Sequence, residues 1–292
     1  MAESSTEARH PASEGFHTLA GQEALAVLLD AQVAALDALR PAIPALERVA
    51  DAAAASLRAG GKLGYAGAGS SGLMALADCL ELAGTFGIAP ERTPMMLAGG
   101  TQSLLRLTGS VEDDPALALA DLDRSGLGAG DTLLCLSASG RTPYALAMAE
   151  AARARGVTVA GFANVAGSAL LTLADIPVLV ATGPEVISGS TRMGAATAQK
   201  VALNMVSVLA AMRLGHVHDG YMVNLVADNI KLIDRAARIV AAIAGVSRDE
   251  AVAALARTDG AVKPAILVAR GMAPGAAGAA LAASGGHLAP LL

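Results

Sequence analysis

Short apolar runs alternate with helix-forming stretches through the middle of the chain. Five of these runs are rich in β-prone residues and lie at 62–66, 93–97, 132–136, 157–162 and 176–180. Residues with helical spacing separate most of them. Strands that alternate with helices form βαβ units, in which a parallel sheet is covered on both faces. The pattern therefore predicts an α/β fold.

The pattern changes on either side of this region. Residues 21–58 are rich in Ala and Leu at helical spacing, which predicts two helices or one helix broken at Pro41 and Pro44. The chain is expected to be helical again from about 196 to 243 and, in shorter stretches, beyond residue 247. We expect three parts: an N-terminal arm with helices (1–58), the α/β domain (59–220) and a C-terminal helical region (221–292).

Small polar residues gather where the first, third and fifth predicted strands end. Each of these loops leads into a helix, whose first backbone N–H groups lack partners and whose dipole favours negative charge. Because the carboxyl ends of parallel strands meet at one edge of a sheet, the loops predict a site for a phosphorylated small molecule. Tight turns alone would explain Gly and Ser in one such loop, but hardly in three. The candidate binding residues are Ser70, Ser71, Ser137, Ser139, Arg141, Thr142, Glu185, Ser188, Ser190 and Thr191.

Composition narrows the choice of partners. Only 2% of the residues are aromatic and the formal net charge is −5, which disfavours both base stacking and binding to nucleic-acid backbones. The N-terminus lacks the basic start and apolar core of a signal peptide, and the long uncharged run at 156–174 holds too many polar residues and glycines for a membrane span. Cys79 and Cys135 are expected to be reduced core residues. We therefore expect a cytoplasmic protein without nucleic-acid or membrane partners.

Three segments carry a resemblance to a known family. They read G-A-G-S-S-G at 67–72, S-A-S-G-R-T-P-Y at 137–144 and G-P-E-V-I-S-G-S-T-R at 183–192. Together they resemble the sugar isomerase (SIS) domain and, more narrowly, the N-acetylmuramic acid 6-phosphate etherases. The similarity runs over most of the chain, from Thr6-Glu7-Ala8-Arg9 to a C-terminal segment like the family's small UBA-like domain. It implies a flavodoxin-like three-layer sandwich with a five-stranded parallel sheet, N-terminal helices and that small C-terminal domain.

The resemblance also implies a lyase that works without metal or cofactor on a phosphorylated amino sugar. Etherases of this family cleave the D-lactyl ether of N-acetylmuramic acid 6-phosphate, giving N-acetylglucosamine 6-phosphate and D-lactate. With the sugar ring open, a base removes the acidic C2 proton, the C3 ether departs, and water adds to the unsaturated aldehyde. The family's two catalytic glutamates correspond to Glu81 and Glu112.

The local sequence allows an independent interpretation of both glutamates. Ala83-Gly84 is a helix stop that would place Glu81 in the last helical turn, where the dipole and apolar neighbours would raise its pKa. A raised pKa suits a general acid, although a solvated glutamate at a helix end is the plainer alternative. Asp114-Pro115 predicts an N-cap and a first helical residue, which leaves Glu112 outside the cap for acid–base work.

The position of Glu81 predicts an oligomer. It lies about ten residues beyond the first polar loop, or roughly 15 Å along a helix, which is farther than one sugar phosphate easily spans. We therefore expect Glu81 to serve the site of a neighbouring subunit, in a homodimer whose active site lies at the interface.

Departures from the etherase pattern leave the substrate open. Leu73 stands where etherases usually carry Arg, Gly194 where they carry Lys, and Leu82-Ala83-Gly84 where they carry Cys-Pro-Pro. The loss of two cations near an anionic substrate could mean another phosphosugar. An aldose–ketose isomerase with this fold needs one enediol base and would leave one glutamate idle. A non-catalytic phosphosugar-binding regulator is the third alternative, although that class usually has two SIS domains and this chain has room for one.

Overall fold

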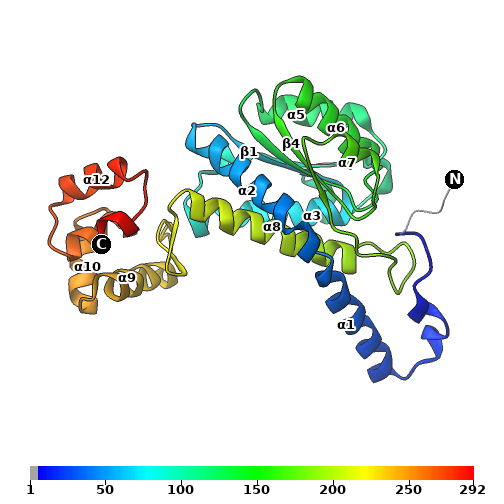
Figure 1. Ribbon diagram of the computed structural model, residues 1–292, viewed down its shortest axis with the longest axis horizontal. Coiled ribbons are helices and arrows are strands. Elements are labelled where there is room, and N and C mark those ends of the chain that lie inside the picture. The colour runs from blue at the N-terminus through cyan, green and yellow to red at the C-terminus, as the bar shows by residue number, and fades with distance from the viewer. Residues whose placement is uncertain (1–5) are drawn as a thin grey trace. The chain divides into compact units, whose positions relative to one another are not determined.

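A five-stranded parallel sheet forms the centre of the computed structural model, which describes residues 6–292 (Figure 1). The strand order is β2-β1-β3-β4-β5, the flavodoxin-like order, so the predicted sheet and all five strands are confirmed. The expectation that no signal peptide is present rests partly on residues 1–5, which lie outside the described residues. The strands are β1 (Leu63–Gly67), β2 (Met95–Leu97), β3 (Thr132–Leu136), β4 (Thr158–Ala163) and β5 (Ile176–Leu179).

Helices cover both faces of this sheet (Figure 1). On one face lie α5 (Pro115–Ser125), α6 (Pro143–Ala154) and the short α7 (Ala169–Leu173). On the other face lie α2 (Ile43–Arg58), α3 (Gly69–Phe86) and α8 (Gly194–Arg213). Short helices α4 (Gln102–Leu105) and η5 (Gly109–Val111) connect β2 to α5. The result is the three-layer sandwich that the alternating pattern predicts.

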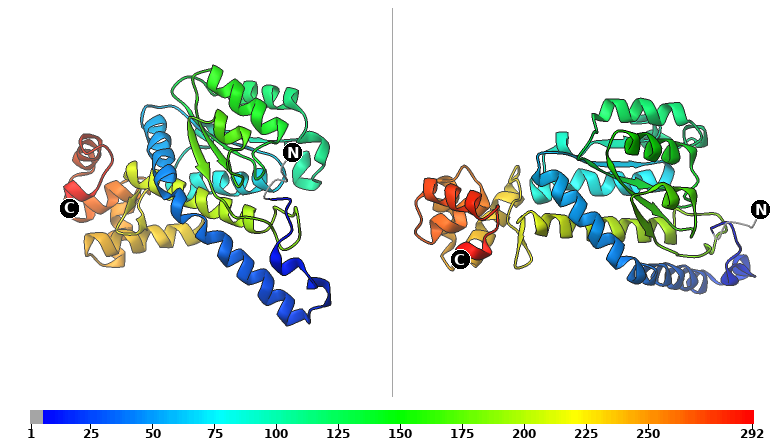
Figure 2. Two further views of the ribbon diagram at one scale, coloured as in Figure 1. Left: turned by 45° about the vertical axis from the view of Figure 1, so that its right-hand side comes forward. Right: turned by 45° about the horizontal axis from the view of Figure 1, so that its top comes forward.

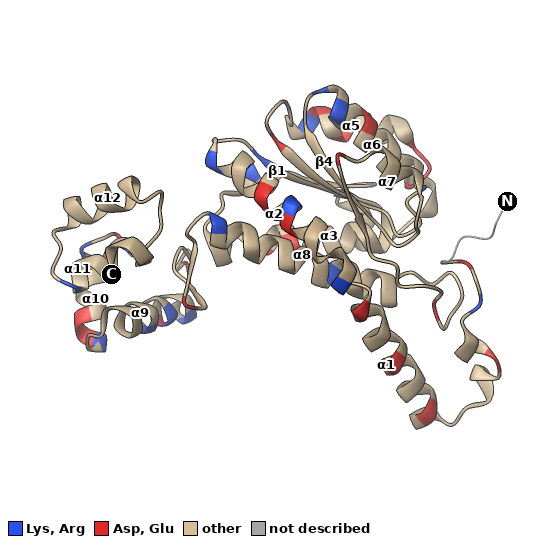
Figure 3. Ribbon diagram, in the orientation of Figure 1, with Lys and Arg blue, Asp and Glu red and all other residues tan. Residues whose placement is uncertain are grey.

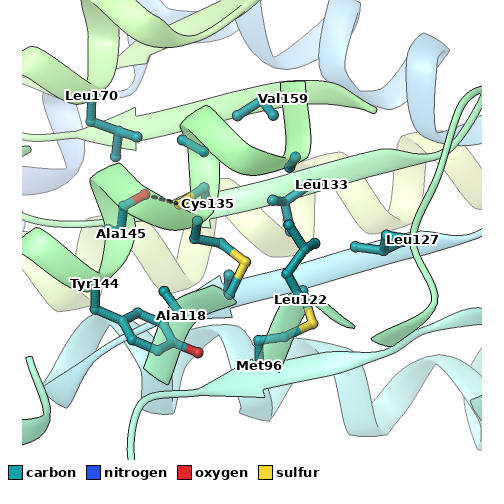
Figure 4. Close-up of a cluster of buried hydrophobic side chains, with 14 of the residues drawn as sticks. Met96, Ala118, Leu122, Leu127, Leu133, Cys135, Tyr144, Ala145, Val159 and Leu170 are labelled. Carbon is teal, nitrogen blue, oxygen red and sulfur yellow. Dashed lines mark hydrogen bonds between the residues drawn. The ribbon is translucent and has the colours of Figure 1, made fainter. Parts of the chain in front are cut away.

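The core between the sheet and helices α5 and α6 is apolar and closely packed (Figure 4). Leu122, Leu133 and Met148 are fully buried there, as is the ring of Tyr144. The Tyr144 hydroxyl donates a 2.6 Å hydrogen bond to the Asp121 carboxylate, so this buried polar group keeps a partner. Cys79 and Cys135 are both buried free thiols, as expected.

Strand β1 and helix α3 approach each other closely through two glycines. A Cβ atom on Gly72 would lie 2.7 Å from the carbonyl oxygen of Gly67, and a Cβ on Gly67 would lie 2.9 Å from the amide nitrogen of Gly72. No side chain fits between these backbones. Helix α3 can therefore begin only two residues after β1 ends, which sets the geometry of the first polar loop.

The N-terminal segment forms two helices, as the prolines predict. Helix α1 (Gly21–Asp37) is followed by a short 3-10 turn (Arg40–Ala42) and by α2. Of the residues in α1 only Ala35 is buried, while Leu25, Leu29 and Val33 are 67%, 63% and 55% exposed. These three residues are spaced four apart and share one face, which we call the α1 stripe. All charged residues of α1 are acidic (Figure 3).

Contacts divide the described chain into two compact units. One comprises the residues up to Cys79 and Glu91–Val206, and the other comprises Leu80–Pro90 and Ser207–Leu292. The second unit has its own apolar core, built around residues such as Val240 and Ile266. Its elements are a two-stranded hairpin (Val217–His218 with Tyr221–Met222) and helices α9 (Ile230–Ala244), α10 (Arg248–Ala256), α11 (Val262–Ala269) and α12 (Pro274–Ala283). The division at residues 58 and 220 stays a prediction.

Two local predictions are wrong. Residues 214–229 are not helical but form the hairpin and its flanking loops. Helix α3 does not stop at Gly84 but continues to Phe86, because the left-handed residue that ends it is Gly87, whose φ is +63°. Glu81 therefore lies five residues before the end of α3 and not in its last turn.

By length and composition, α8 is long and apolar enough to cross a membrane. Helices α11 and α12 meet the same criterion only when they are counted together as one span, which is bent by 119°. Within the tested window of α8, 56% of the residues are buried inside the protein. Burial of this extent is what a helix that packs against a sheet requires.

The close approach of β1 and α3 predicts opposite effects for two glycine substitutions on the same helix. In Gly72→Ala the new methyl group would meet Leu97 Cδ1 at 2.5 Å and the Gly67 carbonyl oxygen at 2.7 Å. We expect overpacking to lower the free energy of unfolding by about 1–3 kcal/mol in urea titrations. In Gly84→Ala the methyl meets nothing within 4 Å. We expect that control to gain about 0.5–1 kcal/mol, and a fully stable Gly72→Ala variant would contradict the close approach.

Candidate functional site

A polar cavity of about 290 Å³ lies at the carboxyl end of the sheet. The loops that follow β1, β2, β3 and β5 form its walls, together with residues 6–7 of the N-terminal arm. This is where ligands bind in open α/β sheets. The lining residues are Thr6, Glu7, Ala68, Gly69, Ser70, Ser71, Leu107, Glu112, Ser137, Ala138, Ser139, Thr142, Gly189 and Thr191.

The cavity brings together seven of the residues that the sequence singles out. They come from all three predicted polar loops and from the loop after β2: Ser70, Ser71, Ser137, Ser139, Thr142, Thr191 and Glu112. Arg141 and Ser188 are exposed and do not line the cavity, and neither do Ser190, Glu185 and Glu81. Their binding and catalytic roles stay predictions.

Hydroxyl groups of the loop after β3 form a connected cluster. The Ser137 hydroxyl lies 2.8 Å from that of Thr142 and accepts a 3.1 Å hydrogen bond from the Gly140 N–H. Ser139 Oγ accepts from the Arg141 N–H at 3.2 Å. Gly140 has a φ of +63°, and a Cβ there would overlap the Ser168 side chain, so the turn needs glycine. The hydroxyls are therefore held in place before any ligand arrives.

The loop after β1 adds donors from a helix N-terminus. Helix α3 begins at Gly69, so Ser70 and Ser71 belong to its first turn, where backbone N–H groups have no preceding helical carbonyls as partners. The positive end of the helix dipole lies at the same point. This turn can hold an anionic oxygen without any basic side chain.

Glu112 is positioned by backbone contacts on both sides. Its N–H donates to the Gly109 carbonyl at 3.0 Å, and its own carbonyl accepts from the Tyr144 N–H at 3.0 Å. The carboxylate lies over Gly69, where a Cβ would come within 2.5 Å of Glu112 Oε1. Partial burial, and to a lesser extent the Asp113 carboxylate, raise the pKa of Glu112 above its usual value. A carboxyl group with this pKa and position can exchange protons with a ligand in the cavity. Asp114 caps α5 by accepting from Leu117 N–H, as predicted.

Glu185 is buried and does not line the cavity. Its side chain is buried, and its two carboxylate oxygens accept hydrogen bonds from the N–H groups of Gly194 and Ala195 at 3.0 and 2.9 Å. This carboxylate therefore satisfies the N-terminus of α8, where a negative charge is stabilised by the helix dipole.

Thr6, Glu7 and Leu107 line the cavity but are absent from the set that sequence reasoning proposed. Thr6-Glu7 belongs to the segment that resembles the etherases, and this resemblance is the one sequence signal that could have identified the two residues as part of the site. Leu107 lies in an irregular loop and has no such signal.

None of the lining residues is a Lys, Arg or His, and within residues 6–292 no group of three or more His, Cys, Asp and Glu side chains is placed to hold a metal.

Comparison with known proteins places the chain in a family. A model described as SIS domain matches residues 30–164. An N-acetylmuramic acid 6-phosphate etherase of Deinococcus radiodurans is 41% identical over 97% of this chain and 93% of that protein. One of Yersinia pestis is 41% identical over 90% of this chain and 89% of that protein. The chain belongs to the N-acetylmuramic acid 6-phosphate etherase family.

The solved structures agree with this membership at the level of the fold. A crystal structure named as a phosphosugar isomerase involved in capsule formation, from Bacteroides fragilis, is 21% identical and has a TM-score of 0.54. The superposition covers 69% of this chain and 95% of the Bacteroides fragilis chain. The SIS fold expected from the three loop segments is therefore confirmed.

Family membership directs attention to Glu81 as well as Glu112. Glu81 is exposed and lies twelve residues beyond the start of α3, or about 18 Å along the helix. The single chain therefore has one of the two expected glutamates in its cavity.

The raised pKa of Glu112 predicts how stability responds to pH. Since the folded protein holds this proton more tightly than the unfolded chain does, stability falls as pH rises from the ordinary pKa of about 4.5 through the raised one. Glu112→Gln cannot ionise. We expect its melting temperature to match or exceed that of the wild type at pH 7.5, with the difference closing at pH 4. Glu91→Gln, which removes an exposed carboxylate elsewhere, is the control. A Glu112→Gln protein less stable than wild type only at neutral pH would contradict a raised pKa.

Proposed function

We propose that this protein cleaves the D-lactyl ether of N-acetylmuramic acid 6-phosphate, releasing D-lactate and N-acetylglucosamine 6-phosphate. The observation that carries the proposal is the cavity itself, which combines hydroxyl-bearing turns suited to a phosphate with Glu112 and its raised pKa. The relatives named as etherases in two bacteria support the same substrate. The steps assigned below need only carboxyl groups and water.

The phosphate is held by the turns after β1 and β3. Hydroxyls of Ser71, Ser137 and Thr142 and the first-turn N–H groups of α3 offer neutral donors around one part of the cavity. Thr191 adds a hydroxyl from the loop after β5. A phosphate fixed in this way leaves the opened sugar chain directed toward the carboxyl groups.

Glu112 is the base for the first step. With the sugar in its open form, the Glu112 carboxylate takes the C2 proton, the C2–H electrons form the C2–C3 double bond, and the C3–O bond to lactate breaks. A pKa above the usual value makes this carboxylate a stronger base than an ordinary surface glutamate. The unsaturated aldehyde then gains water at C3, and C2 recovers a proton.

Glu81 completes the reaction from the other side. As a carboxylic acid it protonates the departing lactate oxygen, and as the resulting carboxylate it takes a proton from the water that adds to C3. Since Glu81 does not line the cavity of its own chain, Glu81 of the partner subunit is the group we assign to this step. The site is then complete only in a homodimer.

The α1 stripe supports such a dimer. Leu25, Leu29 and Val33 are more than half exposed on a 17-residue helix that buries a single residue in the isolated chain. A helix needs an apolar face in contact with a partner to be stable in a protein, and a second copy provides the same face by two-fold symmetry. The mild net charge and the scarcity of aromatic residues fit a cytoplasmic enzyme whose partners are its substrate and its second subunit, with no nucleic acid or membrane.

The assay that tests the function is release of D-lactate from N-acetylmuramic acid 6-phosphate. We expect turnover by the wild type and a loss of roughly 10²-fold or more in Glu112→Gln and in Glu81→Gln, because each removes a proton-transfer group. Asp113→Asn, which changes an exposed neighbour of Glu112, is the matched control and should keep most of the activity. Ligand binding without lactate release by the wild type would point to a phosphosugar isomerase or regulator instead.

Mixing the two inactive variants tests where Glu81 acts. If each site uses Glu112 of one subunit and Glu81 of the other, a mixed dimer has one intact site and one doubly altered site. Random re-association of equal amounts should then restore roughly a quarter of the wild-type rate. If both glutamates act within one chain, no mixture recovers activity.

The α1 stripe gives a separate test of the dimer. Leu29→Glu places a charge in the centre of the stripe, and we expect light scattering to show monomers in place of dimers, together with loss of lactate release. Ala34→Glu, at an exposed position outside the stripe on the same helix, should leave the dimer intact. A Leu29→Glu protein that remains dimeric would show that the stripe is not the contact.

A further inference from the structure

The N-terminal arm forms one wall of the cavity. Thr6 and Glu7 line it, and Thr6 is only 1% exposed although it lies near the start of the chain. Glu7 is exposed and lies where the cavity opens to solvent. No step of the reaction assigned above uses either residue.

The arm runs beside the loop after β5 (Figure 2), and hydrogen bonds between the two hold it in this position. Ser188 Oγ donates to the Glu7 backbone carbonyl at 2.8 Å, and Ser13 Oγ donates to the Val186 carbonyl at 2.7 Å. Gly189 directly follows Ser188 and has a φ of +72°. A Cβ on this glycine would come within 2.8 Å of Glu7 Oε2. The loop thus provides the room that the Glu7 carboxylate occupies, and Ser188 holds the arm through its hydrogen bond to the Glu7 carbonyl.

The two carboxylates of the cavity lie on opposite sides of the phosphate-binding turns. Glu112 comes from the loop after β2, which is one edge strand of the sheet, and contacts the start of α3. Glu7 contacts the loop after β5, the other edge strand. The hydroxyl-bearing turns follow β1 and β3, which lie between these edges. A ligand bound to the turns therefore has one carboxylate on each side.

A carboxylate in this position can only accept hydrogen bonds, and it repels the phosphate. Its natural partner is a sugar hydroxyl or amide N–H, which it binds through a charge-assisted hydrogen bond. The repulsion also disfavours the reversed pose, with the phosphate at the arm and the sugar on the hydroxyl turns. Glu7 is thus suited to fix which way a phosphosugar lies.

We propose that Glu7 is a positioning residue that accepts a hydrogen bond from a hydroxyl or amide N–H of the phosphosugar while the phosphate occupies the turns after β1 and β3. This inference rests on the proposed function for the class of ligand, though not on turnover. It assigns the arm a direct part in recognition.

The test compares two ligands that differ only by the sugar. Calorimetric titration with N-acetylglucosamine 6-phosphate and ³¹P NMR titration with inorganic phosphate are carried out on the wild type, Glu7→Gln and Glu7→Ala. We expect the affinity for the sugar phosphate to fall about 10-fold in Glu7→Ala and less in Glu7→Gln, which keeps one acceptor oxygen, with the affinity for phosphate unchanged or slightly raised. Glu14→Gln, an exposed glutamate of the same arm, is the control and should match the wild type.

Three results would overturn the proposal. Equal losses for both ligands would mean that the arm only supports the turns, and unchanged affinity for both would mean that Glu7 contacts no ligand. A wild type that binds phosphate but not N-acetylglucosamine 6-phosphate would show that the proposed ligand class is wrong. Ser188→Ala, which removes the hydrogen bond that holds the arm, should reproduce the selective loss. Since no lactate is measured, a protein that fails as an etherase can still support or refute the role of Glu7.

Discussion

The close approach of β1 and α3 is the constraint on which the site depends. Gly67 and Gly72 leave no room for a side chain between their backbones, so α3 begins almost at once after the strand. Ser70 and Ser71 are thereby placed in a first helical turn, where the N–H groups are unpaired. Gly69, in the left-handed region, leaves the space that the Glu112 carboxylate fills. The absence of three side chains thus positions both the anion-binding turn and the acid–base group.

The charge balance of the cavity links binding to chemistry. Its lining holds two carboxylates and no basic side chain, so a phosphate is bound by hydroxyls and backbone N–H groups. A cation beside Glu112 would strengthen phosphate binding but would also lower the pKa of the carboxyl group. Leu73, where etherases usually carry Arg, follows directly after the first turn. A leucine at this position adds no positive charge, so phosphate binding depends on the hydroxyls and backbone N–H groups of the turns.

Local patterns predicted the sheet and the hydroxyl-bearing turns, because the preference for a strand or a Gly/Ser turn is set by a few neighbouring residues. The end of α3 was mispredicted for a reason that lies far along the chain. Gly84 is accommodated in the helix with open space around it, whereas a Cβ on Gly87 would overlap Asn224. The arm wall was missed for the same reason, since the hydrogen bond between Ser188 and Glu7 joins residues 181 positions apart. The match of Thr6-Glu7 to the etherase pattern was the only sequence signal that pointed to the arm.

Gly194, where the etherase pattern has Lys, lies beside the buried carboxylate of Glu185. Etherases usually carry Lys at this position, and a lysine there could offset the charge of the buried Glu185. In this chain the Glu185 carboxylate instead accepts hydrogen bonds from the Gly194 and Ala195 N–H groups at the start of α8. A Cβ at residue 194 would lie 3.0 Å from Ala35 Cβ and 3.2 Å from Glu185 Oε2, so a side chain would require α1 and the loop to shift. In this chain the N-terminus of α8 compensates the Glu185 charge without a side chain at residue 194.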